Sequence, residues 1–304
     1  MIRPEDVQDK RVLISPLNWG MGHVSRCIGL IHQLVIQNND VWIACDDRQK
    51  RVFEEYFSDV TFVSHAGYPF QFGGKGHFGW DLLKRSNALR KRLNEEREEV
   101  ASIVKTHAID IVISDHRYGF CSEEVPSIFL THQLNLPVKW YEGGVNALHR
   151  KLIRRFSHVW LMDDDRSSLA GKLSADCPEN GTYIGHYSRF ALYPKKEVKS
   201  VEAVLVASGP ESYAVQLIEQ VLNDPSTPSG LHVVHATSQN FPYQCKGSWR
   251  EKDALIRSAK LIISHSGYST LMDCLELEAE TRLTPTKGQA EQEYLLQLWK
   301  KRKG

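Results

Sequence analysis

The sequence predicts an α/β protein with two domains, each built around a mostly parallel β-sheet. Short apolar runs alternate with helical patterns along the chain, which is typical of parallel strands covered by helices on both faces. The alternation restarts in the second half of the chain. In each half, one apolar run enters a helical pattern through a glycine-containing turn. A chain of 304 residues is long for one domain and suits two.

The first domain is expected to span residues 1–190. Its apolar runs have the length and composition of buried strands, and they lie at residues 12–15, 41–44, 60–63, 109–114, 127–130 and 159–162. Helical patterns occupy residues 23–37, 47–57, 82–106 and 143–156. A turn-rich patch then leads to the domain boundary, which we place within residues 186–200 because residues 193–196 have the composition of a linker.

The second domain is expected to span residues 191–304. Strands are predicted at residues 203–207, 231–235 and 261–264, and helices at residues 211–222, 250–258 and 269–278. The two halves share this alternation but no clear sequence repeat. Residues 278–284 are more polar than a buried parallel strand should be.

Composition and charge exclude several classes of protein. Hydrophobic residues make up 41% and charged residues 25% of the chain, as in an ordinary globular protein. The net charge of +1 argues against nucleic acid as a partner. The six cysteines are scattered without a Cys-x-x-Cys pair, which favours a reducing compartment over a disulfide framework or a zinc site. Without a signal peptide or an apolar run near the ~20 residues of a membrane span, a cytoplasmic protein is expected.

The turn at residues 264–270 predicts an anion-binding site. An apolar run ends there in small polar residues and glycine, and a helical pattern follows at once. Such a helix start offers unpaired N–H groups and the positive end of the helix dipole, which suits a phosphate. The candidate ligand-binding residues in this turn are Ser266, Gly267, Tyr268, Ser269 and Thr270.

Asp273 falls about one turn into the same helix. A carboxylate there could accept two hydrogen bonds from a ribose diol. It could equally be a carboxylate favoured by the nearby helix N-terminus. Ser208 and Gly209 form another strand-to-helix turn, which is common by itself and indicates a binding site only together with the other turns.

A second glycine-containing turn lies at residues 18–23, and Asn18, Gly20 and Gly22 could bring backbone groups close to a ligand. Only a short Gly-x-Gly is present, and Asp46 sits in an ordinary turn, so the signal for a dinucleotide site is weak. His23 is placed to act on a ligand, or is simply a polar residue at a helix start.

Polar side chains also follow two successive strands of the first domain. Asp115, His116 and Arg117 come after one strand, and His132 and Asn135 come after the next. Ligands bind at the carboxyl ends of parallel strands. We therefore favour a functional site here over the alternative, a pair of hydrogen-bonded loops.

Three further segments allow two interpretations each. Gln289, Gln292 and Glu293 follow a turn, and their amide and carboxylate groups suit sugar hydroxyls. The acidic run at residues 163–165 suggests a metal–diphosphate site, but a solvated loop is favoured and no metal is predicted. Basic residues beside apolar ones in segments 80–106 and 149–156 could lie on anionic lipid, although each segment alone is better explained as a solvated helix.

Taken together, these motifs resemble the GT-B glycosyltransferases of family 28. Within that family the chain is most similar to the UDP-N-acetylglucosamine:LPS N-acetylglucosamine transferase-like group, related to the muramoyl-pentapeptide N-acetylglucosaminyltransferase. The resemblance runs from Val12 to about Tyr294. It rests on the ordered segments 16–23, 113–119, 131–135, 183–185, 208–210, 264–270 and 288–293.

The resemblance implies two Rossmann-like domains that face each other across a cleft. The C-terminal domain would hold the UDP-sugar donor, with the diphosphate at residues 266–270, the ribose at Asp273, where related enzymes use a Glu, and the sugar at Gln292 and Glu293. The N-terminal domain would bind the acceptor. No metal is implied, because the helix start stabilises the leaving diphosphate.

The implied reaction is an inverting transfer of a hexosamine, N-acetylglucosamine by family likeness, to a cell-envelope lipid or glycan acceptor. His23 is the first candidate for the base, since an imidazole titrates near neutral pH, and Asp115 is the second catalytic candidate. Such an enzyme would be cytoplasmic, with peripheral contact to the inner membrane.

Two alternatives stay open. One is a non-hydrolysing UDP-N-acetylglucosamine 2-epimerase, although the acid and base carboxylates that it needs are not identifiable. The other is a nucleotide-sugar-binding partner subunit without turnover. Related proteins usually continue with helices beyond the basic run at residues 300–303. The chain is therefore expected to be either naturally short or incomplete at this end.

Overall fold

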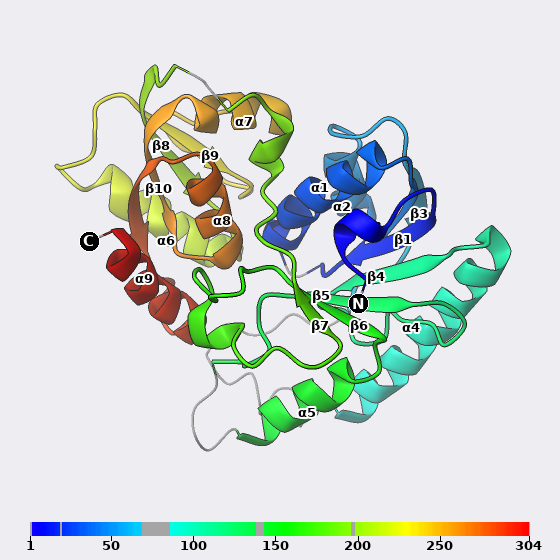
Figure 1. Cartoon of the computed structure of the whole chain (residues 1–304). Helices are drawn as coiled ribbons and strands as arrows, with labels where there is room; N and C mark the ends of the chain where they lie inside the picture. Colours follow the sequence, from blue (N-terminus) through cyan, green and yellow to red (C-terminus); the bar gives the residue numbers. More distant parts are fainter. Residues whose placement is uncertain (1, 19, 69–85, 138–142, 196–197, 304) are drawn as a thin grey trace. The chain divides into compact units, whose positions relative to one another are not determined.

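The computed structural model describes residues 2–18, 20–68, 86–137, 143–195 and 198–303. The chain divides into two compact units (Figure 1). The first comprises Met1–Trp19, Leu30–Lys50 and Ser58–His186, and the second comprises Gly20–Gly29, Arg51–Phe57 and Tyr187–Gly304. Residue 19 of the predicted first turn, residues 80–85 of the predicted basic segment and residue 196 of the predicted linker lie outside the described residues.

The described part of the first unit contains a seven-stranded parallel sheet with the strand order β3-β2-β1-β4-β5-β6-β7. Its strands are β1 (Arg11–Pro16), β2 (Asp40–Cys45), β3 (Thr61–Ser64), β4 (Ile111–Asp115), β5 (Ser127–Thr131), β6 (His158–Leu161) and β7 (Gly181–Tyr183). The first six confirm the predicted strands to within one or two residues. Strand β7 was not predicted, because it has three residues, begins with glycine and directly follows a turn-rich patch.

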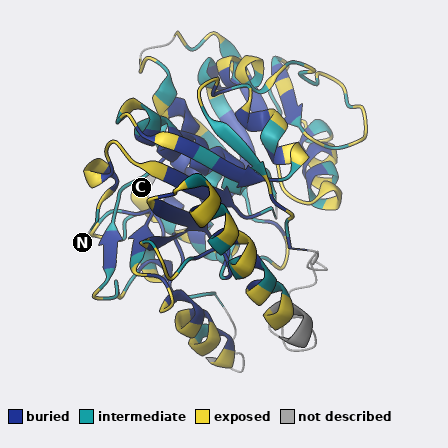
Figure 2. Ribbon diagram, turned by 90° about the vertical axis from the view of Figure 1, so that its right-hand side faces the viewer, coloured by how far each residue is buried: buried dark blue, intermediate teal, exposed yellow. Residues whose placement is uncertain are grey.

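Helices alternate with these strands as predicted. They are α1 (Met21–Ile36), α2 (Asp47–Phe53), α4 (Ser86–His107) and α5 (Gly143–Ile153), with the short 3₁₀ helices η1 (Pro4–Asp6) and η3 (Gly171–Leu173). Residues 21–29 of α1 and 51–53 of α2 belong to the second unit. Val100 and Val104 of α4 pack against side chains of β1, β2 and β4. Ile153 of α5 packs against β5 and β6. In Figure 2 the strands are mostly buried, whereas the helices expose their outer faces.

The described part of the second unit contains a four-stranded parallel sheet with the order β11-β10-β8-β9. Its strands are β8 (Val201–Ala207), β9 (Leu231–His235), β10 (Ala259–His265) and β11 (Glu280–Thr284). Its helices are η4 (Arg189–Leu192), α6 (Glu211–Leu222), α7 (Trp249–Arg257), α8 (Tyr268–Glu276) and α9 (Ala290–Lys303). Leu217 and Ile218 of α6 pack on β8 and β9 to form the core.

Strand β11 explains the polar segment that the sequence left without a clear assignment. It pairs with β10 at the edge of the sheet, and none of its five residues is fully buried. The Thr281 hydroxyl accepts a hydrogen bond from the Trp299 indole of α9 at 3.0 Å. An edge strand with one half-covered face does not need the apolar composition of a central parallel strand.

Candidate functional site

A hollow in the second unit brings together several of the residues predicted to bind a donor. It lies at the carboxyl ends of β8 and β10 and the start of α8, and its space of about 530 Å³ is partly open to solvent. Ser208, Ser269, Thr270 and Asp273 all line it, together with Arg189. Because β8 and β10 are neighbouring parallel strands, the loops that follow them meet at one edge of the sheet.

The start of α8 has the features of an anion site. Gly267 is the N-cap residue, and a glycine has no side chain with which to cap the helix. The N-cap residue itself therefore leaves the first-turn N–H groups uncapped, and the positive end of the helix dipole lies at the same place. Gly209, in the loop after β8, has φ +98°, which favours glycine, and a Cβ there would meet open space.

His265, at the end of β10, connects the two loops. Its buried side chain bonds to the backbone of Ser208, and burial lowers the pKa of the imidazole despite that bond. This histidine is not among the residues predicted to bind a ligand, although it stands directly before Ser266. Its position at the end of a buried strand was the only local signal.

Arg189 is the charged residue at the hollow that sequence reasoning missed. Its Nε donates to Asp253 at 2.7 Å, and its Nη1 donates to Ser25 at 2.6 Å and also to Asp273. Burial opposes the charged guanidinium, but Asp273 and Asp253 outweigh it and raise the pKa of Arg189. Nothing local marks this arginine, because both carboxylates come from distant segments.

Asp273 lines the hollow but already has partners within the protein. The Ser188 hydroxyl donates to its Oδ1 at 2.6 Å, and Arg189 bonds to its Oδ2. Burial raises the pKa of this carboxyl, although Arg189 and Ser188 act in the opposite direction. A ribose diol would therefore have to replace or share these partners.

The predicted sugar-contacting residues lie elsewhere in the second unit. The Gln292 side chain accepts from Thr286 N at 2.8 Å, and its backbone carbonyl accepts from the Ser266 hydroxyl at 2.8 Å. Gln292 thus connects α9 to the turn before α8. Gln289 directly precedes α9 and Glu293 lies in its first turn, and neither they nor Gln292 line the hollow.

The glycine-containing turn near the N-terminus contributes to the second unit. Met21, Gly22 and Ser25 line the hollow, and the Gly22 carbonyl accepts from the Ser269 hydroxyl at 2.9 Å. Gly20 has φ +120°. Asn18 belongs to the first unit, where its side chain accepts from Tyr68 N at 3.2 Å.

His23 has a partner that bears on its predicted role as a base. Arg26 Nη2 lies 2.8 Å from His23 Nδ1. A guanidinium can only donate, so Nδ1 accepts and the neutral ring carries its proton on Nε2. In this arrangement neither ring nitrogen is ready to take a further proton unless the bond to Arg26 opens.

The polar residues after β4 and β5 meet at one edge of the first sheet, as predicted. The rings of His116 and His132 are 5.9 Å apart, and His116 has φ +59°, an uncommon value for a residue with a side chain. Asp115 is completely buried at the end of β4. Asn135 instead braces a loop, because its amide donates to the carbonyls of Lys172 and Ala175.

Arg117 was expected at the acceptor surface, but its side chain is completely enclosed. Its Nε donates to Glu96 at 2.7 Å, and Tyr68 donates to the other oxygen of the same carboxylate at 2.7 Å. Burial works against the charged carboxylate, but bonds from His65, Tyr68 and Arg117 together with the arginine charge lower the pKa of Glu96. In this structure Arg117 supports the loop from inside.

The acidic run at residues 163–165 is only in part the solvated loop that we expected, because Asp165 is exposed and Asp164 half-buried but Asp163 is not accessible. Asp163 is completely buried, and its carboxylate accepts from Leu169 N, Ala170 N and the Ser174 hydroxyl at 3.1, 2.9 and 2.6 Å. Asp163, Asp164 and His186 are close enough together to hold a metal ion. The existing donors use the Asp163 oxygens, however, so the group serves to close the loop.

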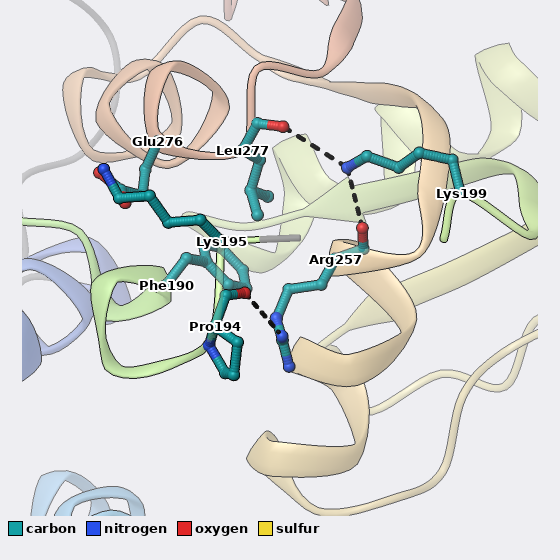
Figure 3. Close-up of a pocket in the computed structure, with 7 residues that line it drawn as sticks. All are labelled: Phe190, Pro194, Lys195, Lys199, Arg257, Glu276 and Leu277. Atoms are coloured by element: carbon teal, nitrogen blue, oxygen red, sulfur yellow. Dashed lines mark hydrogen bonds between the residues drawn. The ribbon is translucent and has the colours of Figure 1, made fainter. Parts of the chain in front are cut away.

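A second hollow in the same unit shares only Phe190 with the first (Figure 3). Lys199 reaches across it to the carbonyls of Arg257 and Leu277, at 2.9 and 3.5 Å. Arg257 donates to the Pro194 carbonyl at 3.2 Å. These cations hold the ends of α7 and α8 and the preceding linker together, which is a structural role.

The fold matches solved structures, whereas the sequence matches no protein-family model and no curated protein. The chain resembles the glycotransferase of kitacinnamycin (TM-score 0.60, 15% identity, 95% of this chain and 84% of that chain). It also resembles spinosyn rhamnosyltransferase SpnG in complex with thymidine diphosphate (TM-score 0.63, 13% identity, 94% of this chain and 84% of that chain). A third match is the glycosyltransferase SnogD from Streptomyces nogalater (TM-score 0.60, 14% identity, 95% of this chain and 85% of that chain).

These likenesses establish the fold. The two parallel α/β units are those of the GT-B architecture shared by the matched proteins. In the described part of the chain, every helix is too short or too polar to cross a bilayer.

Proposed function

We propose that this protein is a glycosyltransferase that takes a hexosamine, N-acetylglucosamine by motif resemblance, from a UDP-sugar. The observation that carries the proposal is the hollow at the start of α8. There a helix N-terminus, the Ser208 loop, the Arg189 cation and the Asp273 carboxylate line one cavity. A structural neighbour was solved with thymidine diphosphate, which is a ligand of the same chemical kind.

The proposed donor site divides the ligand among these groups. The diphosphate lies at the α8 N-terminus beside Arg189, where the N–H groups and the guanidinium stabilise the charge that develops as the bond to the sugar breaks. Asp273 accepts hydrogen bonds from the ribose hydroxyls. No metal has a part in the proposal, because the leaving diphosphate is stabilised by these protein groups.

The proposed reaction inverts the anomeric carbon. An acceptor hydroxyl gives its proton to a base, its oxygen bonds to the anomeric carbon, and UDP leaves with the electrons of the broken bond. His23 remains our first candidate for the base and Asp115 the second. For His23 to act, acceptor binding must open the bond between Arg26 and Nδ1.

The acceptor is proposed to be a lipid-linked or glycan molecule of the cell envelope, reached at the cytoplasmic face of the inner membrane. Helix α5 supports membrane contact. Arg150, Lys151, Arg154 and Arg155, on and just after this helix, are all exposed, and residues 143–156 contain no acidic residue. Such a cationic face suits anionic lipid.

The first experiment compares UDP with 2′-deoxy-UDP, which differ by a single ribose hydroxyl. A hydrogen bond to a charged group contributes about 1.5–3 kcal/mol, so UDP should bind roughly tenfold or more tightly. In Asp273→Ala, UDP binding should weaken and the difference between the two nucleotides should vanish. Calorimetric titration measures both dissociation constants.

Glu276→Ala is the matched control, because Glu276 lies on the same helix and lines the other hollow. It should keep both dissociation constants within about twofold, as expected of a surface substitution. Equal affinity of Asp273→Ala and the natural protein for UDP would remove the proposed ribose contact. Asp273→Asn keeps the shape of the side chain if the alanine variant unfolds.

Turnover separates the remaining alternatives. His23→Ala should bind UDP normally and lose transfer from UDP-N-acetylglucosamine to a membrane extract. Incubation with UDP-N-acetylglucosamine alone tests the epimerase alternative, and formation of the manno epimer would overturn the transferase proposal. Donor binding with no product on any acceptor would instead indicate a binding subunit.

A further inference from the structure

Asp253 is a buried carboxylate that the proposed reaction does not use. It lies on α7, is completely buried and does not line the hollow. Its oxygens accept hydrogen bonds from Arg189 Nε at 2.7 Å, Tyr56 at 2.6 Å and Tyr193 at 3.1 Å. The groups that meet here come from three separate parts of the second unit.

The two tyrosines keep this carboxylate in one orientation. Burial and the nearby Asp253 charge raise the pKa of Tyr193 to about 12. The same two causes raise the pKa of Tyr56 further. Both phenols therefore remain protonated donors at neutral pH. Because both of them bond to Oδ2, the Oδ1 atom is left to accept from Arg189.

Arg189 is consequently fixed at two edges of its planar guanidinium. Nε is bound by Asp253, and Nη1 is shared by Ser25 and Asp273. The plane also lies against the Phe190 ring, 4.2 Å from its centroid. Nη2 takes part in none of the hydrogen bonds that the described residues make to Arg189.

Asp253 limits how far Asp273 can compete with a ligand for the N–H groups of Arg189. A guanidinium and a carboxylate prefer a bidentate pair of parallel hydrogen bonds. Without Asp253, Asp273 is the carboxylate left beside Arg189, and a bidentate pair would take up Nη2 as well as Nη1 and so withdraw the guanidinium from a ligand. With Nε held by Asp253, only Nη1 reaches Asp273.

We propose that Asp253 is a positioning residue, which holds Arg189 by its Nε edge and leaves Nη2 for the diphosphate of the donor. This inference rests on the proposed function, because it assumes that a nucleoside diphosphate occupies the hollow. It predicts that loss of Asp253 weakens the binding of the diphosphate part of the ligand and leaves the binding of the nucleoside part unchanged. A merely structural role would weaken the binding of the whole nucleotide.

The test uses the full chain and measures the affinity of UDP and of uridine, which lacks the diphosphate. Asp253→Asn keeps the size of the side chain and removes its charge. It should weaken UDP binding about tenfold and leave uridine binding unchanged. In an Arg189→Ala background, Asp253→Asn should cause no further loss for UDP, because the group through which it acts is gone.

Glu251→Gln is the matched control, since it changes a carboxylate to an amide on the same helix and Glu251 bonds at the Ser248 cap. It should leave both affinities unchanged. If Asp253→Asn does not fold, Tyr56→Phe provides the second variant, with a smaller loss that is again confined to UDP.

The outcomes are distinguishable. If the natural protein binds UDP but Asp253→Asn weakens UDP and uridine equally, the positioning role is wrong and the proposed function stands. Unchanged or tighter UDP binding by Asp253→Asn, or an additive loss in the Arg189→Ala background, likewise overturns the positioning role and leaves the proposed function standing. If the natural protein binds no nucleoside diphosphate, the proposed function fails and the inference fails with it.

Discussion

Arg117 and Arg189 are both buried guanidinium groups whose Nε donates to a carboxylate at 2.7 Å. Their surroundings differ. Arg117 is completely enclosed with Glu96, and its Nη1 has no partner among the described residues. Arg189 instead lines a hollow. The same kind of ion pair therefore lies inside a loop in the first unit and beside an open hollow in the second, where we propose that the cation meets the donor.

Removal of Glu96 should be costly, because it leaves the enclosed Arg117 charge without its carboxylate. Loss of one partner of a buried pair destabilises a protein by about 3–5 kcal/mol, so Glu96→Ala should lower the free energy of unfolding by this amount. Urea unfolding of the full chain measures the change. Glu98→Ala, at an exposed position on the same helix, should stay within about 0.5 kcal/mol. Equal effects of the two substitutions would contradict the internal role of the pair.

The same carboxylate predicts a pH dependence. The pKa of Glu96 is lowered in the folded protein, so its contribution to stability is complete above the unfolded value, about 4.3, and is lost as the pH falls through the lower folded value. The stability difference between the natural protein and Glu96→Ala should therefore shrink in strong acid. A constant difference between neutral pH and pH 2 would show that the charge is not responsible.

At the scale of the element, helix α7 begins at a capping motif that is visible in the sequence and carries Asp253, which contacts Arg189. Ser248 and Glu251 form a capping box, in which the Ser248 hydroxyl accepts from Glu251 N and the Glu251 carboxylate accepts from Ser248 N at 2.6 Å. The cap fixes the start of the helix that carries Asp253. A local sequence signal thus supports a long-range contact.

Ser248→Ala should loosen this helix by about 1 kcal/mol, the usual value of an N-cap side chain. Since 1.4 kcal/mol is a factor of ten in an equilibrium constant, the amides of the first turn of α7 should exchange with solvent about fivefold faster. Ser229→Ala, at an exposed loop position, serves as the control and should leave that exchange rate unchanged. Identical exchange in the two variants would show that the cap does not limit opening.

The elements also show which signals a sequence carries well. Helix α6 has the predicted bounds, residues 211–222, because its apolar positions repeat with a helical period and Asn223 ends the regular pattern. Strands β7 and β11 carry no such signal. One is too short to show a period, and the other is polar because it lies at an edge.

At the scale of the whole molecule, a net charge of +1 conceals an uneven distribution. Helix α5 and the residues after it expose four cations with no acidic residue among them. Helix α4, in contrast, pairs Lys91 and Arg92 with Glu95 and Glu99. The described part of the basic segment at residues 80–106 is thus largely neutralised, and α5 remains the candidate for lipid contact.

Vesicle binding tests this surface in the complete protein. The protein should bind phosphatidylglycerol vesicles and not phosphatidylcholine vesicles. Each cation near an anionic surface contributes about 1 kcal/mol, so Lys151→Glu combined with Arg154→Glu should weaken binding at least roughly tenfold. Lys300→Glu combined with Lys301→Glu changes the charge equally on α9 and should have little effect. If both pairs weaken binding equally, general electrostatic attraction rather than α5 is responsible.

The sequence by itself determined the alternation of strands and helices, the parallel character of both sheets and the turns at which the strand ends carry polar residues. These features depend on residues that are close together in the chain. The signals are the period of the apolar residues, glycine in turns and polar residues at helix starts. The turns that carry Ser208, Ser269, Thr270 and Asp273 were identified in this way, whereas their grouping into one donor site came from the family resemblance; all four line one hollow.

Only the tertiary structure decided what these residues meet. Arg189 lies 64 residues from Asp253 and 84 residues from Asp273, and no local pattern indicates that the three side chains share one buried cluster. The enclosure of Arg117, the closed loop around Asp163 and the pairing of His23 with Arg26 are likewise properties of packing. The physical reason is that burial and ion pairing depend on which distant segments come together, whereas the period of a strand or helix is set by its own residues.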